Sequence, residues 1–380
     1  MSVYHDLGTR PVINACGVYT DLGGTVLTPG IWAAMTQANA SSVDMIELLE
    51  AAGRVVADLL GAEAARVTPG ASAAIALGTA ACLAGADGAA MERLPDTTGL
   101  RGDVLIQAHH RYKYDRMVRL TGARLVAVGD DDGVTTERAL AAALDGASTA
   151  AIMVPAHLDG IEGTVPLSAV SRLARAAEVP ILVDAAYLNF PPAAMAAHLA
   201  AGADLVCFSA KYFWGPNSGG FIAGRRDLIE GVAVGDFTRY ESGQHLIFGR
   251  PYKMDRQTVV GTVAALREWF EMDHDARLSG YRATVEALAR DLAELPGVHL
   301  EPRNFTMIET YGAVPVNCLY LRLEPDVARA TPAELEAGLR AGDPSIRVIG
   351  EPDGIAIVVE TLVGDDANVI VERVRDLLDG

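Results

Sequence analysis

Short apolar runs alternate with amphipathic or alanine-rich stretches from about residue 65 to residue 225, and this alternation constrains the fold more than any other feature. The apolar runs predict strands at 103–107, 124–128, 150–154, 180–184, 204–208 and 220–223. The stretches between them predict helices at 72–83, 112–121, 136–144, 167–177 and 193–201. Runs such as 181–183 are apolar on both faces, as in strands that helices cover on each side. The pattern therefore predicts an α/β domain with a mainly parallel sheet.

The sequence after residue 225 has a different texture and predicts a second, smaller domain. A polar, irregular segment at 235–251 leads into two helical patterns, at 256–271 and 279–295. Strand patterns follow at 316–323, 346–350 and 355–360, with helical patterns at 331–339 and 367–378. Thr331 and Glu334 form a capping box, and Pro332 occupies the first helical position, which marks the start of one of these helices. Together these elements indicate a small α+β domain.

Charge and composition exclude several classes of protein. The 380 residues include 31 basic and 49 acidic side chains, which gives a net charge of −18. Such a surplus offers nucleic acid and anionic membranes no long-range attraction, so we expect neither as a partner. There is no apolar run of about 18 residues and no basic segment followed by an apolar run at the N-terminus, so we expect no membrane span and no signal peptide. Four widely spaced cysteines favour free thiols in the cytoplasm over disulfides or a metal site.

Lysine is rare in this chain, and the few lysines limit the possible amine chemistry. Arginine occurs 28 times, whereas lysine occurs only at Lys113, Lys211 and Lys253. Arginine stays protonated, whereas a lysine that is buried or placed beside positive charge can lose its proton and attack a carbonyl. A protein of this sequence that uses an amine nucleophile therefore has three candidates.

Two charged residues follow neighbouring predicted strands. Asp184 ends the run 181–183, and Lys211 follows the run 205–209. In a parallel sheet the carboxyl ends of strands face the ligand crevice, so both side chains are expected there. Aromatic residues around Lys211 disfavour its charged form, which lowers the pKa of the amine. The alternatives are a turn-capping aspartate and a surface lysine, but a surface lysine explains neither the aromatic neighbours nor the glycine-rich turn at 215–220.

A third feature is the segment 68–72, Thr-Pro-Gly-Ala-Ser, which precedes a helical stretch of small residues. Helix N-termini bind phosphate through free N–H groups, although any helix can begin in this way. A phosphate cradle, a strand-end aspartate and a strand-end lysine, in this order, are what pyridoxal 5′-phosphate (PLP) requires. His109 and His110 follow the strand at 103–107, where an imidazole can stack on the cofactor ring; the alternative for each is a polar loop residue.

Four stretches resemble the selenocysteine synthase-like (SelA-like) branch of the fold-type I PLP enzymes, and within it the D-glucosaminate-6-phosphate ammonia-lyase group. The stretches are residues 11–24, 67–72, 94–100 and 110–115. The resemblance covers most of the first 270 residues and ends near 249–253. It implies a large α/β domain of the aspartate aminotransferase type with a small α+β domain, and a homodimer. The implied division is an N-terminal segment at 1–30 that contributes to the active site, a PLP-binding domain at 31–250, and an interdomain helix with the C-terminal domain at 251–380.

Carried over position by position, the resemblance implies roles for individual residues. Lys211 is then the lysine that binds the PLP aldehyde, Asp184 pairs with the pyridine nitrogen, and His110 stacks on the ring. The implied phosphate ligands are Gly70, Ala71, Ser72 and Ser209. The sequence departs from its relatives in two ways, because only Ala210 separates Ser209 from the lysine and because the bulky run 212–214 follows it. Full-length selenocysteine synthases carry an N-terminal tRNA-binding domain, whereas the resemblance here begins almost at Met1, so we expect no such domain and no tRNA partner.

These features lead to the prediction of a PLP-dependent lyase that removes ammonia from a small β-hydroxy or sugar-derived amino acid by α,β-elimination. Lys211 is the expected general base at Cα. No metal is expected. Side chains that could assist the leaving group or hold the substrate are Tyr19, Asp21, His245, Arg250, Arg256 and Lys253. The alternatives are another PLP reaction (transamination, racemisation or aldol cleavage), selenium transfer on seryl-tRNA, and a PLP-binding protein without catalysis.

Overall fold

The computed structural model describes residues 2–305 and 315–379, which form two compact units. The larger unit is Leu27–Glu271, and the smaller unit joins Met1–Val26 to Met272–Gly380. The sequence predicts boundaries between residues 30 and 31 and between residues 250 and 251. The structure assigns α11 (Arg256–Glu271) to the larger unit because this helix packs against α2 (Pro29–Asn39) and α3 (Met45–Leu60).

The larger unit is built on a seven-stranded sheet of order β2-β8-β7-β6-β5-β3-β4. Five strands from β7 to β4 run parallel, and only β8 is antiparallel to its neighbours. The strands are β2 (Ala64–Thr68), β3 (Asp103–Gln107), β4 (Arg124–Val128), β5 (Thr149–Pro155), β6 (Ile181–Asp184), β7 (Leu205–Ser209) and β8 (Gly220–Gly224). The predicted α/β class with a mainly parallel sheet is thus confirmed.

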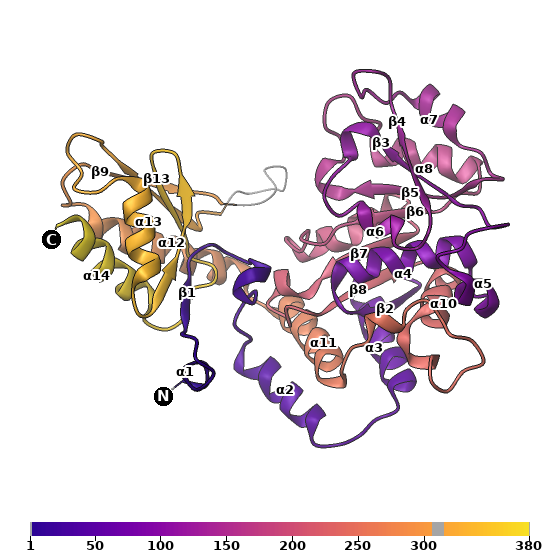
Figure 1. The fold of residues 1–380 in the computed structure, drawn as a ribbon, viewed down its shortest axis with the longest axis horizontal. Helices are drawn as coiled ribbons and strands as arrows, with labels where there is room; N and C mark the ends of the chain where they lie inside the picture. The colour runs from indigo at the N-terminus through magenta and orange to yellow at the C-terminus, as the bar shows by residue number, and fades with distance from the viewer. Residues whose placement is uncertain (1, 306–314, 380) are drawn as a thin grey trace. The chain divides into compact units, whose positions relative to one another are not determined.

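Helix α4 (Gly70–Ala84) lies on this sheet, as Figure 1 shows. Its side chains are buried along nearly its whole length. Its alanine-rich sequence suits this place, because small side chains let the helix approach the strands. At Gly78 an added Cβ would lie 2.7 Å from Ile222 and 3.2 Å from Leu182. Apolar side chains on both faces of β5 and β6 are buried, as the apolar runs predict.

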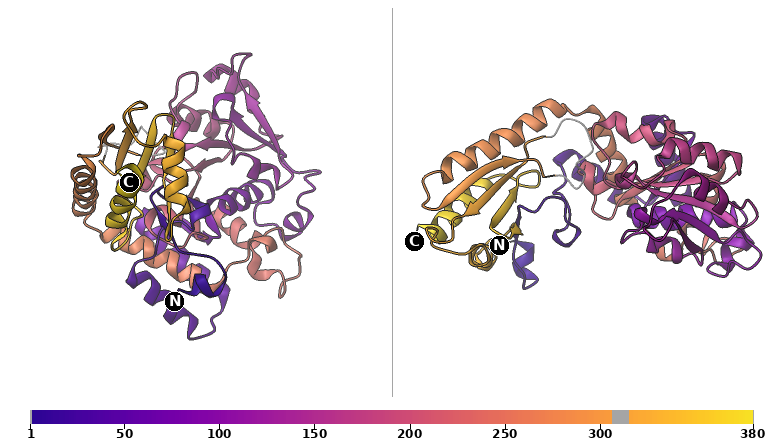
Figure 2. Two further views of the ribbon diagram at one scale, coloured as in Figure 1. Left: turned by 60° about the vertical axis from the view of Figure 1, so that its left-hand side comes forward. Right: turned by 90° about the horizontal axis from the view of Figure 1, so that it is seen from above.

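Further helices surround the sheet of the larger unit, and they are visible on both of its sides in Figure 2. They are α5 (Gly88–Arg93), α6 (Arg116–Arg119), α7 (Glu137–Ala143), α8 (Leu167–Ala176), α9 (Ala197–Ala200) and α10 (Arg226–Gly235). The predicted helix at 112–121 is reduced to α6. The Asp115 side chain accepts the Tyr112 backbone N–H at 3.3 Å. This hydrogen bond holds residues 112–115 in a non-helical turn, so the helix begins only after it.

The smaller unit contains an antiparallel sheet of order β12-β13-β10-β9. Its strands are β9 (Val298–Arg303), β10 (Cys318–Leu323), β12 (Ile349–Glu351) and β13 (Gly354–Val358). Helices α12 (His274–Leu292), α13 (Pro332–Ala341) and α14 (Asp366–Leu378) pack with it around an apolar core. The predicted capping box is present, because Thr331 accepts from the Glu334 backbone and the Glu334 side chain accepts from the Thr331 N–H.

The N-terminal segment belongs to this smaller unit. After the short helix α1 (Val3–Asp6), strand β1 (Val12–Asn14) pairs in parallel with β11 (Ser345–Arg347). The backbone N–H of Val358 donates to the Ala15 carbonyl at 2.9 Å, and the Thr361 hydroxyl donates to the Asn14 carbonyl at 2.7 Å. In Figure 1 the indigo strand β1 accordingly lies among the orange and yellow elements of the C-terminal part.

Candidate active site

The sheet register aligns the carboxyl ends of the strands that carry the predicted site. Pro155 of β5 is paired with Asp184 of β6, and Asp184 is paired with Cys207 of β7. On the other side, Ser209 pairs with Gly220 of β8, and Gly220 pairs with Thr68 of β2. The segments that follow β2, β5, β6 and β7 therefore leave the same edge of the sheet, where a ligand of an open α/β sheet binds.

Asp184 lies at this edge and is buried, with 5% of its surface exposed. Its Oδ1 accepts the backbone N–H of Ala186 at 3.0 Å, and its Oδ2 accepts the hydroxyl of Tyr112. The pKa of Asp184 is raised, because the effect of burial outweighs the lowering effect of these two donors. Burial and the neighbouring carboxylate raise the pKa of Tyr112 well above its usual range, so the phenol stays protonated and donates. A buried acid held in this way can pair with a cationic ring nitrogen.

Lys211 lies in the 3₁₀ turn Ala210–Phe213, directly after β7, and is 9% exposed. Backbone hydrogen bonds fix this turn, because Ala210 N–H donates to the Gly219 carbonyl at 2.9 Å and Gly215 N–H donates to the Ala210 carbonyl at 2.8 Å. The Nζ atom lies 4.7 Å from the ring centroid of Tyr212. The lysine therefore has the aromatic and buried surroundings that the sequence predicts.

The backbone is strained directly after Lys211. Trp214 ends the turn in the left-handed conformation, with a φ of 61°, which costs about 1 kcal/mol for a residue other than glycine. Its indole packs edge-on against Trp269 at a centroid distance of 5.9 Å. Strain of this kind is typical of residues that a functional site holds in place.

The predicted phosphate cradle is the start of α4, which follows β2. Pro69 is the N-cap residue, and no side-chain cap is found for this helix among the described residues. The first N–H groups of the helix therefore remain available to an anion. Gly220 makes the cradle compact, because a Cβ there would lie 2.7 Å from the Cα of Gly70 and 2.5 Å from the Phe208 carbonyl oxygen. Ser209, paired with Gly220, lies beside this helix start.

A run of four rings, which we call the aromatic wall, extends from Asp184 toward Lys211. The Tyr112 ring lies 5.4 Å from His157, His157 lies 5.3 Å from Tyr187, and Tyr187 lies 5.8 Å from Tyr212. All four side chains are partly buried. His157, Tyr112 and Tyr187 are not among the site residues that the sequence predicts. The position of His157 just after the buried strand β5 is the signal that could have drawn attention to it.

The two adjacent histidines after β3 have different environments. His110 is fully buried, and burial lowers its pKa, while a backbone contact with Leu158 acts in the opposite direction. The exposed His109 instead links two loops, because its ring nitrogens lie 3.2 Å from the Glu162 carbonyl and 3.0 Å from the Asp132 carbonyl. Of the two, His110 is thus the residue that lies inside the larger unit, next to the end of β3.

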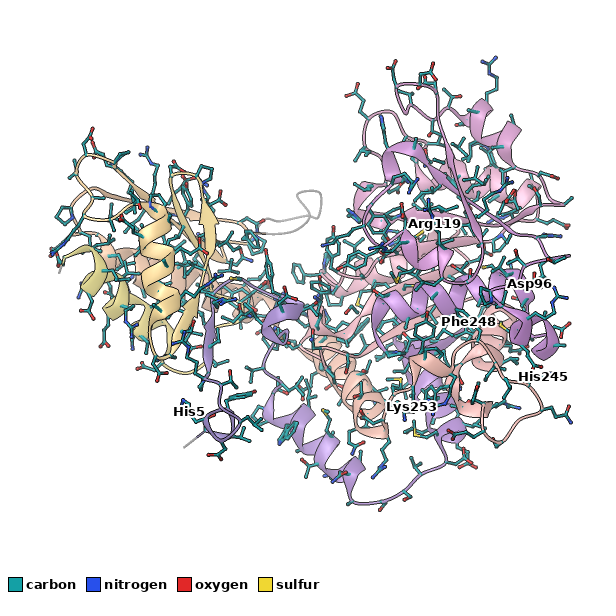
Figure 3. The ribbon with its side chains drawn as sticks, in the orientation of Figure 1. His5, Asp96, Arg119, His245, Phe248 and Lys253 are labelled. Atoms are coloured by element: carbon teal, nitrogen blue, oxygen red, sulfur yellow. The ribbon has the colours of Figure 1, made fainter. Side chains whose placement is uncertain are left out.

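The remaining predicted side chains of the larger unit make contacts outside this sheet edge. His245, labelled in Figure 3, lies beside α5 with its Nδ1 2.8 Å from the Glu92 carboxylate. Arg256 donates to the Ala38 carbonyl at the end of α2 at 2.8 Å. Arg250 donates to Glu241 at 3.1 Å, and Lys253 is exposed. Their predicted role in substrate binding stays a prediction.

Tyr19 and Asp21 belong to the smaller unit, next to β1. Tyr19 is 44% exposed and precedes the short 3₁₀ turn Thr20–Leu22, which contains the exposed Asp21.

No group of three or more histidine, cysteine or acidic side chains in the described residues could hold a metal ion. Within the same residues, no helix has the length and apolarity to cross a membrane.

The residues at the sheet edge fit PLP. The lysine could supply the amine, the buried acid a partner for the ring nitrogen, and the helix start a phosphate cradle. This combination on a mainly parallel α/β sheet defines the class of fold-type I PLP-dependent enzymes.

Comparison with known proteins agrees with this class. A 5′-C-glycyluridine monooxygenase-decarboxylase from a Streptomyces species is 30% identical over 99% of this chain and 92% of the relative. D-glucosaminate-6-phosphate ammonia lyase from Salmonella typhimurium is 27% identical over 99% of this chain and 98% of the relative. An L-seryl-tRNA(Sec) selenium transferase from Moorella thermoacetica is 26% identical over 99% of this chain and 84% of the relative. No family model matches the chain.

Solved structures agree as well. A structure of D-glucosaminate-6-phosphate ammonia-lyase superimposes with a TM-score of 0.86 and 26% identity, covering 99% of this chain and 98% of that one. The chain therefore belongs to the SelA-like family of fold-type I PLP-dependent lyases and transferases, as its sequence motifs indicate.

Proposed function

We propose that the protein binds PLP and eliminates ammonia from a small β-hydroxy or sugar-derived amino acid. The observation that carries this proposal is the alignment of Asp184, Lys211 and the start of α4 at one edge of the sheet. When bound, PLP supplies an aldehyde for the substrate amine and a ring that withdraws electrons from Cα. The ammonia-lyase relative, similar over nearly its whole length, supports the reaction type.

Each residue of the site then has a defined task. Asp184 holds the proton of the pyridine nitrogen, supported by the hydroxyl of Tyr112. The N–H groups of Ala71 and Ser72, with the hydroxyls of Ser72 and Ser209, bind the phosphate. His110 contacts the ring. Lys211 holds the aldehyde and, once the substrate amine has replaced it, takes the proton from Cα.

The test uses purified protein loaded with PLP and a panel of β-hydroxy and sugar-derived amino acids. Ammonia and keto acid are measured without any keto-acid acceptor. We expect equal amounts of both products, and we expect Lys211→Ala to abolish them. Lys113→Ala is the matched control, because Lys113 is exposed and its Nζ lies 5.1 Å from the centroid of Tyr114. If product forms only when an acceptor is added, the reaction is transamination and the proposed elimination is wrong.

A second candidate reaction is oxidative decarboxylation, favoured by the 30% identical relative, which is a monooxygenase-decarboxylase. The aromatic wall would shield such a reaction from water. The same panel, followed with an oxygen electrode and a carbon dioxide assay, separates the two reactions. Elimination consumes no dioxygen and releases no carbon dioxide.

We further propose a homodimer in the cytoplasm. The location is supported by the four free cysteines, because a reducing compartment keeps thiols unpaired. Burial raises the pKa of Cys16 to about 11 and the pKa values of Cys82 and Cys318 to about 12, so these thiols stay protonated. Light scattering after gel filtration tests the dimer, and a mass of about one chain would contradict it.

A further inference from the structure

We infer that His109 is a positioning residue, which holds the neighbouring His110 in place for the cofactor ring by joining two loops. This inference rests on the proposed function, in which His110 contacts PLP. Both histidines belong to the 3₁₀ turn Ala108–His110, directly after β3. His110 is fully buried, whereas His109 is exposed, and the proposed reaction assigns no task to its ring. Through this turn, the ring of His109 can act on the cofactor without touching it.

The order of the strands places the turn between two loops. Strand β3 pairs in parallel with β4 on one side and with β5 on the other. Parallel strands end at the same edge of a sheet, so the segments that follow these three strands lie next to one another. The loop 129–136 after β4 and the loop 156–166 after β5, which we call the β4 loop and the β5 loop, thus flank the turn.

The imidazole of His109 contacts both loops. Its Nε2 lies 3.0 Å from the Asp132 carbonyl oxygen in the β4 loop, and its Nδ1 lies 3.2 Å from the Glu162 carbonyl oxygen in the β5 loop. We call these two contacts the His109 link. Both partners are acceptors, and only the imidazolium has an N–H on each ring nitrogen. The protonated ring can therefore donate to both loops at once, whereas the neutral ring can donate to only one.

Two glycines leave room for this ring. A Cβ at Gly133 of the β4 loop would lie 2.7 Å from Nε2 of His109, and a Cβ at Gly163 of the β5 loop would lie 2.8 Å from Nδ1. Both glycines have a positive φ, of 83° and 79°, which glycine adopts without strain. The ring is thus packed between the two loops as well as bonded to them, and this fixes its position.

The residues on either side of His109 are tied to the β5 loop as well. The buried Gln107 side chain donates to the Val165 carbonyl at 2.8 Å and accepts the Val165 N–H at 2.6 Å. His110 has a backbone contact with Leu158. The turn is therefore anchored on one loop at three places, and at His109 it is also joined to the β4 loop.

The His109 link should depend on pH. The titratable side chains on the two loops are Asp130, Asp131, Asp132, His157, Asp159 and Glu162. Histidine is the residue type whose charge changes between about pH 5 and about pH 8. Burial lowers the pKa values of His110 and His157, so these two rings lose their protons at lower pH than an ordinary histidine. As the pH rises and the His109 imidazolium loses its proton, one of its two hydrogen bonds is lost, and we expect PLP binding to weaken.

The test measures the dissociation constant of PLP by equilibrium dialysis for wild type and His109→Phe. Phenylalanine keeps a flat ring between the loops but has no ring nitrogen. We expect the variant to bind PLP roughly tenfold more weakly at pH 5.5, the effect of losing hydrogen bonds to a charged group, and less than about threefold more weakly at pH 8.5. His299→Phe is the matched control and should bind like wild type, since the His299 side chain is 53% exposed in the smaller unit.

A pair of glycine variants tests the packing without changing the histidine. Gly163→Ala places a Cβ against the His109 ring, whereas Gly160→Ala in the same loop places one in open space. The two positions have similar positive φ values, 79° and 76°, so both substitutions strain the backbone to a similar extent. We expect Gly163→Ala to weaken PLP binding as His109→Phe does, and Gly160→Ala to leave it unchanged. General damage to the loop would instead affect both variants alike.

One readout needs no cofactor. In the PLP-free protein, NMR of nitrogen-labelled histidine should show that His109 carries protons on both ring nitrogens at pH 5.5 and on one at pH 8.5. A neutral ring at pH 5.5, equal PLP affinities of wild type and His109→Phe, an affinity ratio that does not change with pH, or equal losses in the two glycine variants would overturn the role of His109 alone. If wild type binds no PLP at either pH, the proposed function itself is wrong, and this inference fails with it.

Discussion

Glu360→Gln should remove a pH dependence from the stability of the smaller unit. Glu360 follows β13 and is partly buried. Burial raises its pKa from 4.5 to about 7, and this effect outweighs the opposing contributions of Arg277, the Asn317 side chain and the Val18 backbone. The folded unit therefore binds the proton more tightly than the unfolded chain does.

The sign and size of the effect follow from this difference. Below pH 4.5 the carboxyl is protonated in both states, and its contribution to stability is complete. As the pH rises from 4.5 to about 7, the unfolded state releases the proton first, and stability is lost. A pKa difference of this size corresponds to about 3 kcal/mol, or about 1.4 kcal/mol per pH unit. Glutamine carries no such proton, so the variant should not show this loss.

The assay must report on the smaller unit. All three tryptophans, Trp32, Trp214 and Trp269, lie in the larger unit, so tryptophan fluorescence reports on that unit. Hydrogen exchange of the β10 and β13 amides, compared between wild type and variant at the same pH, reports on the smaller one. Between pH 5 and pH 7 the protection of these amides against exchange should become greater in the variant than in wild type. Above that range the difference in protection should stay constant.

A matched variant and a clear contrary result complete this test. Glu294→Gln changes an exposed glutamate of the same unit and should leave the comparison independent of pH. If the difference between wild type and Glu360→Gln does not change with pH, or if the variant loses protection as the pH rises, the reasoning about the buried carboxyl is refuted.

Three further substitutions probe the larger unit. Asp236→Ala should cost about 3 to 5 kcal/mol in thermal unfolding, because it leaves the charge of Arg66 buried without its partner at 2.5 Å; a loss below about 1 kcal/mol would contradict this. Gly220→Ala should weaken PLP binding at least about tenfold in equilibrium dialysis, since its Cβ would press on the start of α4, and unchanged binding would argue against the cradle. Tyr112→Phe should lower the melting temperature of the protein without PLP, because buried Asp184 loses a donor worth about 1 to 3 kcal/mol; an unchanged temperature would refute the role of this bond.

The elements of the larger unit could be predicted because their signals are local. The strands β3 and β4 were predicted with the bounds that the structure has, and Lys211 and Asp184 were placed at strand ends from the apolar runs before them. Parallel strands buried on both faces leave a continuous apolar pattern that a single sequence reveals. Position along the chain was thus enough to place Lys211 directly after a strand, and its role as the amine nucleophile stays a prediction.

The aromatic wall and the place of the N-terminal segment were beyond such reasoning. Tyr112 and Asp184 are 72 residues apart, and their contact depends on the order of strands in the sheet, which local periodicity does not specify. Likewise, Val12 pairs with Ser345 across almost the whole chain, although the strand itself has only three residues. Contacts of this kind are set by tertiary packing.

The central claim is that Lys211 binds the aldehyde of PLP at this sheet edge. Its most direct test is the visible absorption of the purified protein after PLP is added and the excess is removed. We predict a yellow band in the wild-type protein and in Lys113→Ala, and its loss in Lys211→Ala. A band that persists in Lys211→Ala, or that is missing from the wild-type protein, would contradict the account.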